Sequence, residues 1–147
     1  MSKERDTLKF HYLQHSADLI QEHPRPRLLP CNLSPQQARV IKALSVMEPV
    51  SQIELAREFG ITAASMSTMT TRLIALNYVS AERDPQNAKR NLISLTDDGR
   101  VLVSDIARIW AEVDTFMEEK IGSDNMDKLA ELTKLLRDAL GGRVPGT

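Results

Sequence analysis

The spacing of apolar residues along the chain predicts a protein built mainly from helices. An amphipathic stripe over roughly residues 6–22 predicts one helix, which ends before a proline-rich connector. Ser34 and Gln37 have the spacing of a capping box, so a second helix is expected from Pro35 to about Met47. Its inner side is expected to carry Ala38, Ile41, Leu44 and Ser45.

Two further helices are expected on either side of a tight turn. Ser51 and Glu54 form a second capping-box pattern, which opens a short helix that Gly60 ends. Thr62 is the expected N-cap of a fourth helix that runs to about Leu76. The buried side of this fourth helix should hold Met66, Met69 and Leu73. Two helices joined by a turn of a few residues form a helix-turn-helix arrangement.

The apolar period changes from helical to alternating after the fourth helix. Residues 79–83 and 90–95 alternate in the manner of β-strands, and Asp84-Pro85-Gln86-Asn87 between them has strong turn chemistry. The two segments predict a β-hairpin with a cationic tip. A helix-turn-helix followed by a hairpin is typical of a winged helix, in which one helix enters the DNA major groove and the wing reaches the neighbouring minor groove.

A long helix is expected after the hairpin, because Thr96 can cap a helix whose first turn holds two carboxylates. It should run to about Lys120, roughly 37 Å, before Gly122-Ser123 separates it from a last amphipathic helix. The apolar positions of the two helices are Val101, Leu102, Ile106, Ile109, Trp110, Val113, Phe116 and Met117, and then Met126, Leu129, Leu132, Leu135, Leu136 and Leu140. A small winged domain cannot bury this much apolar surface.

The expected fold class is therefore mainly α with a small β-hairpin: a winged helix-turn-helix with N- and C-terminal dimerisation helices. The expected divisions are a dimerisation helix and connector (1–33), a DNA-binding domain (34–100) and C-terminal dimerisation helices (101–147). Twofold pairing of two copies would place the recognition helices about one DNA turn apart, which suits a pseudo-palindromic operator in double-stranded DNA. The alternative is a compact monomer whose last helices fold back over the winged domain.

Composition and charge narrow the class of partner. The chain has 147 residues, of which 41% are hydrophobic and 27% charged, as in a globular domain with extra arms. Nineteen Lys and Arg against 20 Asp and Glu give a net charge of −1, which excludes a uniformly basic nucleic-acid binder. The charge is nevertheless segregated, since residues 60–96 hold four cations and two acids whereas residues 101–147 hold six cations and nine acids. The first of these segments suits phosphate contact.

The outer side of the fourth helix and the hairpin supply the candidate DNA contacts. Small hydroxylated side chains can approach base edges closely, and an arginine can reach guanine or phosphate. The residues expected at the major groove are Ser65, Ser67, Thr68, Thr71 and Arg72, and those expected at the wing are Arg83, Lys89 and Arg90. The caps Ser34 and Thr62 are further candidates for phosphate contact. The alternative is an ordinary solvated face, although Ser and Thr are poor helix formers.

Other chemistry is sparse in this sequence. The single cysteine, Cys31, cannot form an intrachain disulfide, and no signal peptide or membrane-spanning run is visible, so a cytoplasmic protein is expected. No catalytic motif, phosphate-binding loop or zinc-binding Cys pair is present, so neither an enzyme nor a cofactor or metal is expected. His11 and His15 leave a metal sensor as an alternative, and Cys31 near Arg25 and Arg27 leaves a peroxide sensor.

Several motifs together resemble the MarR family of bacterial transcription regulators. They are Leu-Ala-Arg-Glu-Phe-Gly-Ile at 55–61, the helix through residues 65–73, the turn Glu-Arg-Asp-Pro-Gln-Asn at 82–87 and Leu-Thr-Asp-Asp-Gly at 95–99. The resemblance covers nearly the whole chain and implies a homodimeric winged-helix repressor, released from DNA by a small aromatic effector, an oxidant or, in some members, a metal. The implied effector pocket lies between the dimer helices and the winged domain, with His11, Tyr12, His15, Cys31 and Trp110 as candidates.

The wing departs from the family's pattern at one point. Where the family has Asp-x-Arg, this chain has Asn87-Ala88-Lys89, followed by Arg90. In the family that Asp orients the arginine that enters the minor groove. Our hypothesis is that Asp84 takes over this role by pairing with Lys89 or Arg90.

The sequence therefore predicts a dimeric winged-helix regulator that binds DNA. One alternative is a winged-helix module that joins proteins without specific DNA binding, for which an acidic or apolar face in place of the cationic wing would be expected. A second alternative keeps DNA binding and makes oxidation of Cys31 the switch.

Overall fold

The computed structural model describes residues 8–145 of the chain and is mainly helical, with a small antiparallel sheet. The elements are α2 (Lys9–Gln21), α3 (Arg25–Leu28), the 3-10 turn η1 (Leu29–Cys31), α4 (Pro35–Met47), β1 (Val50–Ser51), α5 (Gln52–Phe59), α6 (Ala63–Ala75), β2 (Val79–Asp84), β3 (Asn87–Leu95), α7 (Asp97–Ile121) and α8 (Ser123–Ala139). The expected winged helix-turn-helix is confirmed. The predicted beginning of the first helix, at residue 6, lies outside the described residues.

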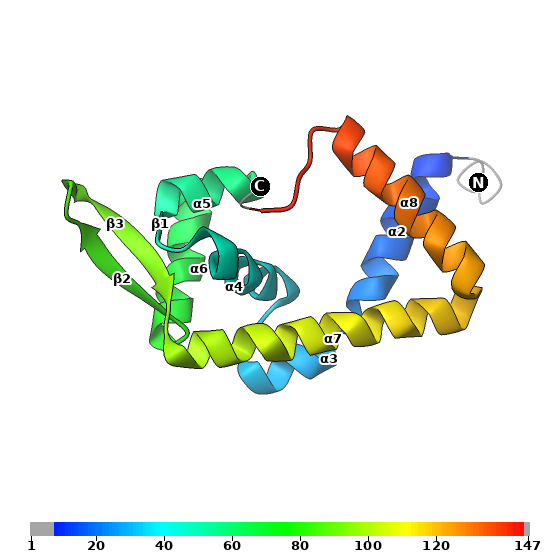
Figure 1. Ribbon diagram of the computed structural model, residues 1–147, viewed down its shortest axis with the longest axis horizontal. Coiled ribbons are helices and arrows are strands. Elements are labelled where there is room, and N and C mark those ends of the chain that lie inside the picture. Colours follow the sequence, from blue (N-terminus) through cyan, green and yellow to red (C-terminus); the bar gives the residue numbers. More distant parts are fainter. Residues whose placement is uncertain (1–7, 146–147) are drawn as a thin grey trace.

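The long helix α7 links two separate parts of the molecule (Figure 1). Helices α4, α5 and α6 and the sheet form a winged lobe around its first half, whereas α2 and α8 lie beside its second half. The core of the lobe is built from side chains that are almost completely buried, among them Ile41, Leu44, Leu55, Met66, Leu73, Ile93 and Ile106. Since α7 contributes Ile106 to this core, the lobe and the first half of the long helix are packed as one unit.

The predicted helix starts are confirmed by their caps. Ser34 Oγ accepts a hydrogen bond from the Gln37 amide at 3.2 Å, and Gln37 Oε1 accepts one from the Ser34 amide at 2.8 Å. Ser51 and Glu54 form the same reciprocal pair at α5. Helix α5 ends at Gly60, whose φ of 61° lies in the left-handed region that glycine adopts without strain. These polar groups fix where each helix of the helix-turn-helix begins and ends.

The sheet has one strand that the sequence did not predict. Strand β1 is only two residues long and pairs antiparallel with β3, with Val50 opposite Ile93 and Ser51 opposite Leu92. The resulting order is β1-β3-β2, and β3 begins at Asn87 rather than at Arg90. A two-residue strand has no period that sequence analysis can detect. It matters for the site because it attaches the wing to the residue that caps α5.

Three helical details also differ from expectation. The proline-rich connector is helical over α3 and η1, and it docks on α7 through an ion pair of 2.7 Å between Arg27 Nε and Glu112 Oε2. Ser45 is exposed rather than on the inner side of α4, and its hydroxyl donates to the Lys42 carbonyl at 2.6 Å. Val101 is 66% exposed, because the core-facing stripe of α7 follows Leu102, Ile106 and Ile109 instead.

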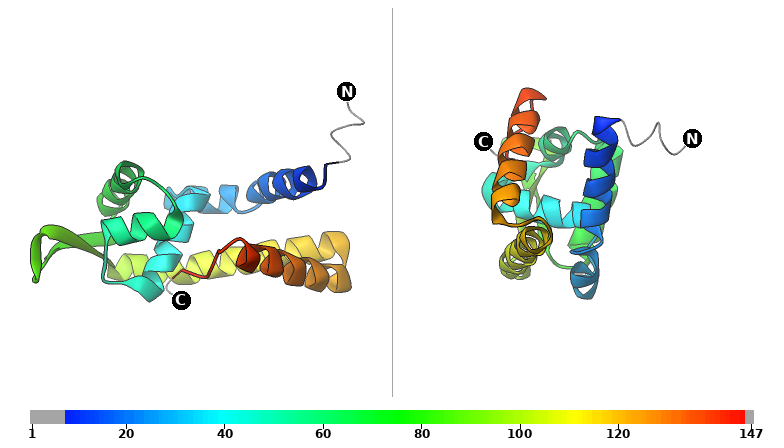
Figure 2. Two further views of the ribbon diagram at one scale, coloured as in Figure 1. Left: turned by 90° about the horizontal axis from the view of Figure 1, so that it is seen from above. Right: turned by 90° about the vertical axis from the view of Figure 1, so that its right-hand side faces the viewer.

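The terminal helices leave their apolar side chains uncovered in the single chain. No residue of α2 or α8 is buried, and Leu132 and Leu135 of α8 are 62% and 65% exposed. The two helices lie apart on either side of the molecule (Figure 2), with a groove of about 620 Å³ lined by α2, α7 and α8. Helix α8 turns at the end of α7 and rises away from it (Figure 1), so the helix itself does not cover the winged lobe as a compact monomer would require; only the segment after α8 reaches the lobe. No helix within residues 8–145 is long and apolar enough to cross a bilayer.

Candidate nucleic-acid interface

Helix α6 has one buried side and one polar, exposed side. Met66, Thr70 and Leu73 are buried, and the Thr70 hydroxyl is satisfied by donating to the Met66 carbonyl at 2.7 Å. Met69 is only half-buried. The five residues predicted to face the major groove all lie on the exposed side: Ser65, Ser67, Thr68, Thr71 and Arg72. The structure thus brings these candidates together on one helix, while their contact with DNA stays a prediction.

The hydroxyl groups on this side differ in their remaining hydrogen-bonding capacity. Thr68 donates to the Ala64 carbonyl at 3.1 Å and Thr71 to the Ser67 carbonyl at 2.8 Å, so both retain lone pairs for accepting. Ser65 Oγ accepts from the Thr62 hydroxyl at 2.9 Å and keeps its own proton. The Ser67 hydroxyl makes no hydrogen bond within residues 8–145 and can either donate or accept. This side of α6 can therefore meet both donors and acceptors on base edges.

Three of the predicted cations are exposed and make no ion pair with any residue that the structure describes. They are Arg72 on α6, Arg83 on β2 and Lys89 near the tip of the wing. The ion pairs of the described chain instead involve Arg90, Arg100 and other arginines and lysines. An unpaired exposed cation has its full charge available for a phosphate.

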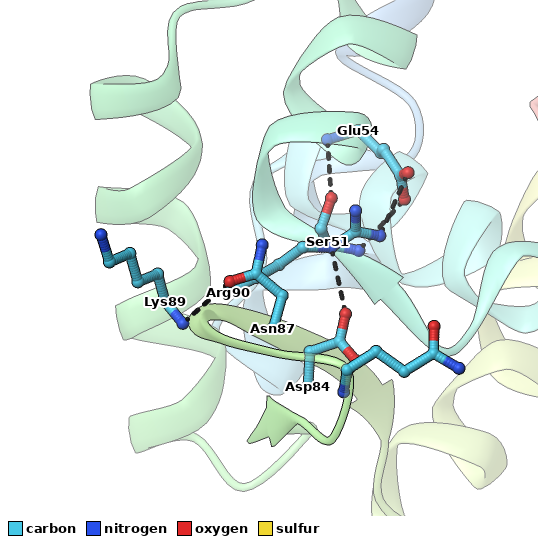
Figure 3. A network of polar contacts seen from close by, with 7 residues as sticks. Ser51, Glu54, Asp84, Asn87, Lys89 and Arg90 are labelled. Atoms are coloured by element: carbon cyan, nitrogen blue, oxygen red, sulfur yellow. Dashed lines mark hydrogen bonds and ion pairs between the residues drawn. The ribbon is translucent and has the colours of Figure 1, made fainter.

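The tip of the wing is shaped by short side chains that bond to nearby backbone. Asp84 Oδ1 accepts from the Gln86 amide at 2.9 Å, and Asn87 Oδ1 accepts from the Lys89 amide at 3.2 Å. Arg83 pairs with Asn91 whereas Asp84 pairs with Asn87, so β3 carries the extra residues of a bulge at this point. The two neighbouring cations, Lys89 and Arg90, point in different directions here, as consecutive residues of a strand do (Figure 3).

Arg90 points back toward the helix-turn-helix and lies between two carboxylates (Figure 3). Its Nη2 donates to Glu54 Oε1 at 3.2 Å, and its buried Nε, which makes no hydrogen bond, lies 3.5 Å from Asp84 Oδ2. The pairing that our hypothesis requires is present between Asp84 and Arg90, while the role of Asp84 in orienting a cation toward DNA stays a prediction. Sequence reasoning missed Glu54, whose capping-box pattern accounted for it without a second partner.

A hollow of about 510 Å³ lies between α6, the predicted recognition helix, and the wing. Ser67 lines it from α6 and Lys89 from the wing, so a side chain from each predicted contact region faces the same space. Gln52 and Ile53, at the start of α5, line it as well, and Ile53 is 57% exposed. Sequence reasoning missed both, because an apolar residue near the start of a short helix carries no sequence signal that it is exposed.

The remaining candidates are not brought together into one site. Trp110 lines a cavity of about 340 Å³ with Phe59, Arg39 and Lys42, but none of the other effector candidates lines it. The rings of His11 and His15 lie on α2 with centroids 5.8 Å apart and planes tilted by 35°, and Tyr12 is exposed on the same helix. No group of three His, Cys, Asp or Glu able to hold a metal exists within the described residues.

Cys31 is half-buried and packs against the core of the winged lobe. Burial raises the pKa of its thiol above the ordinary value, and the nearby negative charge of Asp105 raises that pKa further. The thiol is therefore protonated near neutral pH. Redox sensing requires a lowered pKa, so the surroundings of Cys31 oppose the oxidation switch.

Comparisons with known proteins point in one direction. A model described as the MarR family matches residues 32–90. The HTH-type transcriptional regulator FarR of Neisseria gonorrhoeae is 31% identical over 120 residues, which cover 79% of this chain and 82% of that protein. The family model covers the whole helix-turn-helix and the wing as far as Arg90, and the match to FarR is about twice as long.

Solved structures of similar fold include two bound to DNA. The transcriptional repressor CouR on a 23-mer duplex matches with a TM-score of 0.82 and 23% identity, over 89% of this chain and 93% of that chain. The S. aureus MepR–DNA complex matches with a TM-score of 0.75 and 17% identity, over 89% and 98%. MarR of E. coli without ligand matches with a TM-score of 0.78 and 15% identity, over 88% and 96%.

Proposed function

The chain belongs to the MarR family, and from this premise we propose that it is a homodimeric transcriptional regulator that binds a pseudo-palindromic operator. The observation that carries the proposal is the surface formed by the exposed side of α6 and the wing. Exposed hydroxyl groups and three unpaired cations lie on this surface, and Ser67 of α6 and Lys89 of the wing line one hollow between them, on a chain whose net charge is −1. Its relatives support the proposal, since CouR and MepR have been captured on DNA.

We assign the contacts by the chemistry of each side chain. Ser65, Ser67, Thr68, Thr71 and Arg72 would face base edges in the major groove, and Arg83 and Lys89 of the wing would meet phosphates and the minor groove. Arg72 is the one side chain of the helix that can form a bidentate pair with guanine. It should therefore contribute more to the choice of sequence than any single hydroxyl group.

A second copy of the chain supplies the symmetry that such an operator requires. The exposed apolar side chains of α2 and α8 provide the pairing surface, because they are uncovered in the single chain. Two recognition helices related by a twofold axis then read two half-sites.

Release by a small effector is typical of this family. Within the described residues, the cavity at Trp110 is suited to a small aromatic anion, because Phe59 and Trp110 offer ring surfaces while Arg39 and Lys42 offer positive charge. Its position between α4, α5 and α7 links the helix-turn-helix to the long helix. A ligand there would bear on the spacing of the recognition helices.

The test is binding of the purified protein to its own upstream intergenic DNA, compared with an unrelated duplex over a salt series. We expect selective, salt-sensitive binding that Arg72→Ala weakens by about tenfold or more. Arg108→Ala is the matched control, because Arg108 lies on α7 away from the wing, 69% exposed and paired with Asp105. Equal affinity for every duplex, even at low salt, would contradict the proposal and favour a protein-interaction module instead.

A further inference from the structure

We infer that Arg90 is a positioning residue that braces the wing, and that Lys89 is the cation that the wing presents to DNA. The inference rests on the proposed DNA-binding function. The sequence alone gives the two neighbouring cations the same role. In the structure, Arg90 forms ion pairs within the protein, whereas Lys89 is left to contact DNA. The division follows from the charges around each side chain.

The positive charge of Arg90 is already balanced by carboxylates of the protein, so it is not available to a phosphate. Its guanidinium lies within 3.2 Å of Glu54 and 3.5 Å of Asp84, so one positive charge faces two negative charges. The carboxylate of Asp84 is only 15% exposed and is further held by the Gln86 amide, so it cannot swing away. A phosphate approaching this corner would meet a net negative charge.

The two carboxylates belong to different elements, and this is what makes Arg90 a brace. Asp84 ends β2, while Glu54 lies in the first turn of α5 and uses its other oxygen to accept from the Ser51 amide at 3.4 Å. Ser51 is itself paired with Leu92 of β3. Arg90 therefore closes a ring that joins the wing to the start of the helix-turn-helix and fixes the angle between them.

Lys89 has the opposite surroundings. Its amide is held by Asn87, its side chain is exposed, and it makes no ion pair within residues 8–145. In Figure 3 the side chain extends toward the recognition helix and away from Glu54. Lys89 and Arg90 both line the hollow that Ser67 lines, but only Lys89 brings an unpaired charge to a DNA backbone that lies across it.

In the first test, the direction in which one substitution changes the operator affinity distinguishes the two possible roles of Arg90. Glu54→Gln removes a negative charge but keeps the capping box, because Gln serves at this position as well as Glu. If Arg90 braces the wing, Glu54→Gln should weaken operator binding about two- to fivefold, as should Arg90→Ala, with no further loss in the double variant. If Arg90 instead contacts DNA, Glu54→Gln should tighten binding by freeing it, and that result would overturn the inference.

The second test counts phosphate contacts from the salt dependence of the operator affinity. Lys89→Ala should lower the slope of log K against log salt by about 0.9, the value for one lost contact with duplex DNA. Arg90→Ala should leave the slope unchanged while lowering the affinity. Arg90→Lys should fail to restore binding, since a single ammonium cannot hold both carboxylates in the geometry of a guanidinium. A slope lowered by Arg90→Ala and restored by Arg90→Lys would overturn the assignment.

Hydrogen exchange in the free protein separates this inference from the proposed function. Arg90→Ala and Glu54→Gln should both speed amide exchange over residues 84–91, whereas Lys89→Ala should not. Unchanged exchange in the first two variants would refute the brace even if the wild-type protein binds its operator. Faster exchange in a protein that binds no DNA would support the brace while refuting the regulator and the role of Lys89.

Discussion

At the scale of single residues, the hydroxyl groups of α6 differ in whether they can donate or only accept a hydrogen bond at a base edge. Thr68 and Thr71 donate their hydroxyl protons to carbonyl groups of their own helix. They are therefore suited to accept hydrogen bonds from the exocyclic amines of adenine or cytosine. Ser67 keeps both its proton and its lone pairs. A row of similar side chains thus presents a mixed pattern, which is one way a helix without Asn or Gln can discriminate between bases.

Cys31 gives a prediction at this scale. A thiol whose pKa is raised by burial and by Asp105 holds its proton at neutral pH and reacts slowly with peroxide. We expect equal operator affinity for the wild-type protein and Cys31→Ser after peroxide treatment, measured by gel shift. Raising the pH through the pKa of the thiol should increase its rate of alkylation, because the fraction of thiolate then grows. Release of DNA by peroxide from the wild type alone would support the oxidation switch instead.

The exposure of a side chain was predictable where it follows from the position on one helix. The exposed side of α6 could be predicted from the period of Met66 and Leu73, because a helix fixes which residues share a face. The tie between Arg90 and Glu54 could not, since these residues are 36 positions apart and their approach depends on the bulge and on β1. The sequence placed Arg90 beside Lys89, and alternation along a strand separates their directions, but nothing in the sequence indicated which of the two meets Glu54 and Asp84.

At the scale of elements, the start of α7 is docked tightly on the end of the wing. The Tyr78 carbonyl accepts from the Thr96 amide at 3.1 Å, and the Thr96 hydroxyl donates to the Asn77 carbonyl at 2.6 Å. Gly99 lies in the first turn against the same Tyr78 carbonyl, where a Cβ atom would overlap the oxygen. This close approach explains why the Leu-Thr-Asp-Asp-Gly motif ends in glycine.

Gly99→Ala should therefore destabilise the protein, although alanine is normally the better helix former. The added methyl group must push α7 away from Tyr78, at a cost of about 1–3 kcal/mol in the free energy of unfolding. Urea denaturation followed by circular dichroism measures this. Ser104→Ala is the control, because Ser104 is exposed on the same helix and its replacement should be neutral or mildly stabilising. A stabilising effect of Gly99→Ala would show that the junction is loose.

Prediction of elements succeeded where a cap or a period marks them and failed where packing decides. The capping boxes at Ser34 and Ser51 and the glycine at 60 carried local chemistry that determines the helix ends. Strand β1 and the helical connector have no such signal. Their backbone conformation depends on partners distant in sequence, namely β3 for the strand and Glu112 of α7 for Arg27 in the connector.

At the scale of the whole molecule, α7 connects the two functions of the chain. Its first turn packs through Gly99 against Tyr78, which directly precedes the wing. Its second half lies beside the terminal helices α2 and α8, and there the His23 ring stacks on Phe116 at 4.3 Å. Beyond α8, Arg143 Nη2 reaches back to Glu58 of α5 at 2.8 Å. A change in the packing of the terminal helices would thus be transmitted to the helix-turn-helix both along α7 and through this ion pair.

The last prediction concerns the terminal helices α2 and α8, because a variant that cannot form the dimer should also bind DNA weakly. Two glutamates in place of Leu132 and Leu135, both largely exposed on α8, would bury charge in the dimer interface. We expect the Leu132→Glu/Leu135→Glu variant to sediment as a 16.5 kDa monomer and to lose operator affinity by about a hundredfold, since each monomer holds only one half-site. Lys128→Glu changes the net charge by the same two units on the same helix and should leave both properties intact. A monomeric variant that kept full operator affinity would mean that one winged lobe suffices for recognition, and the apolar surfaces of α2 and α8 would then need another explanation.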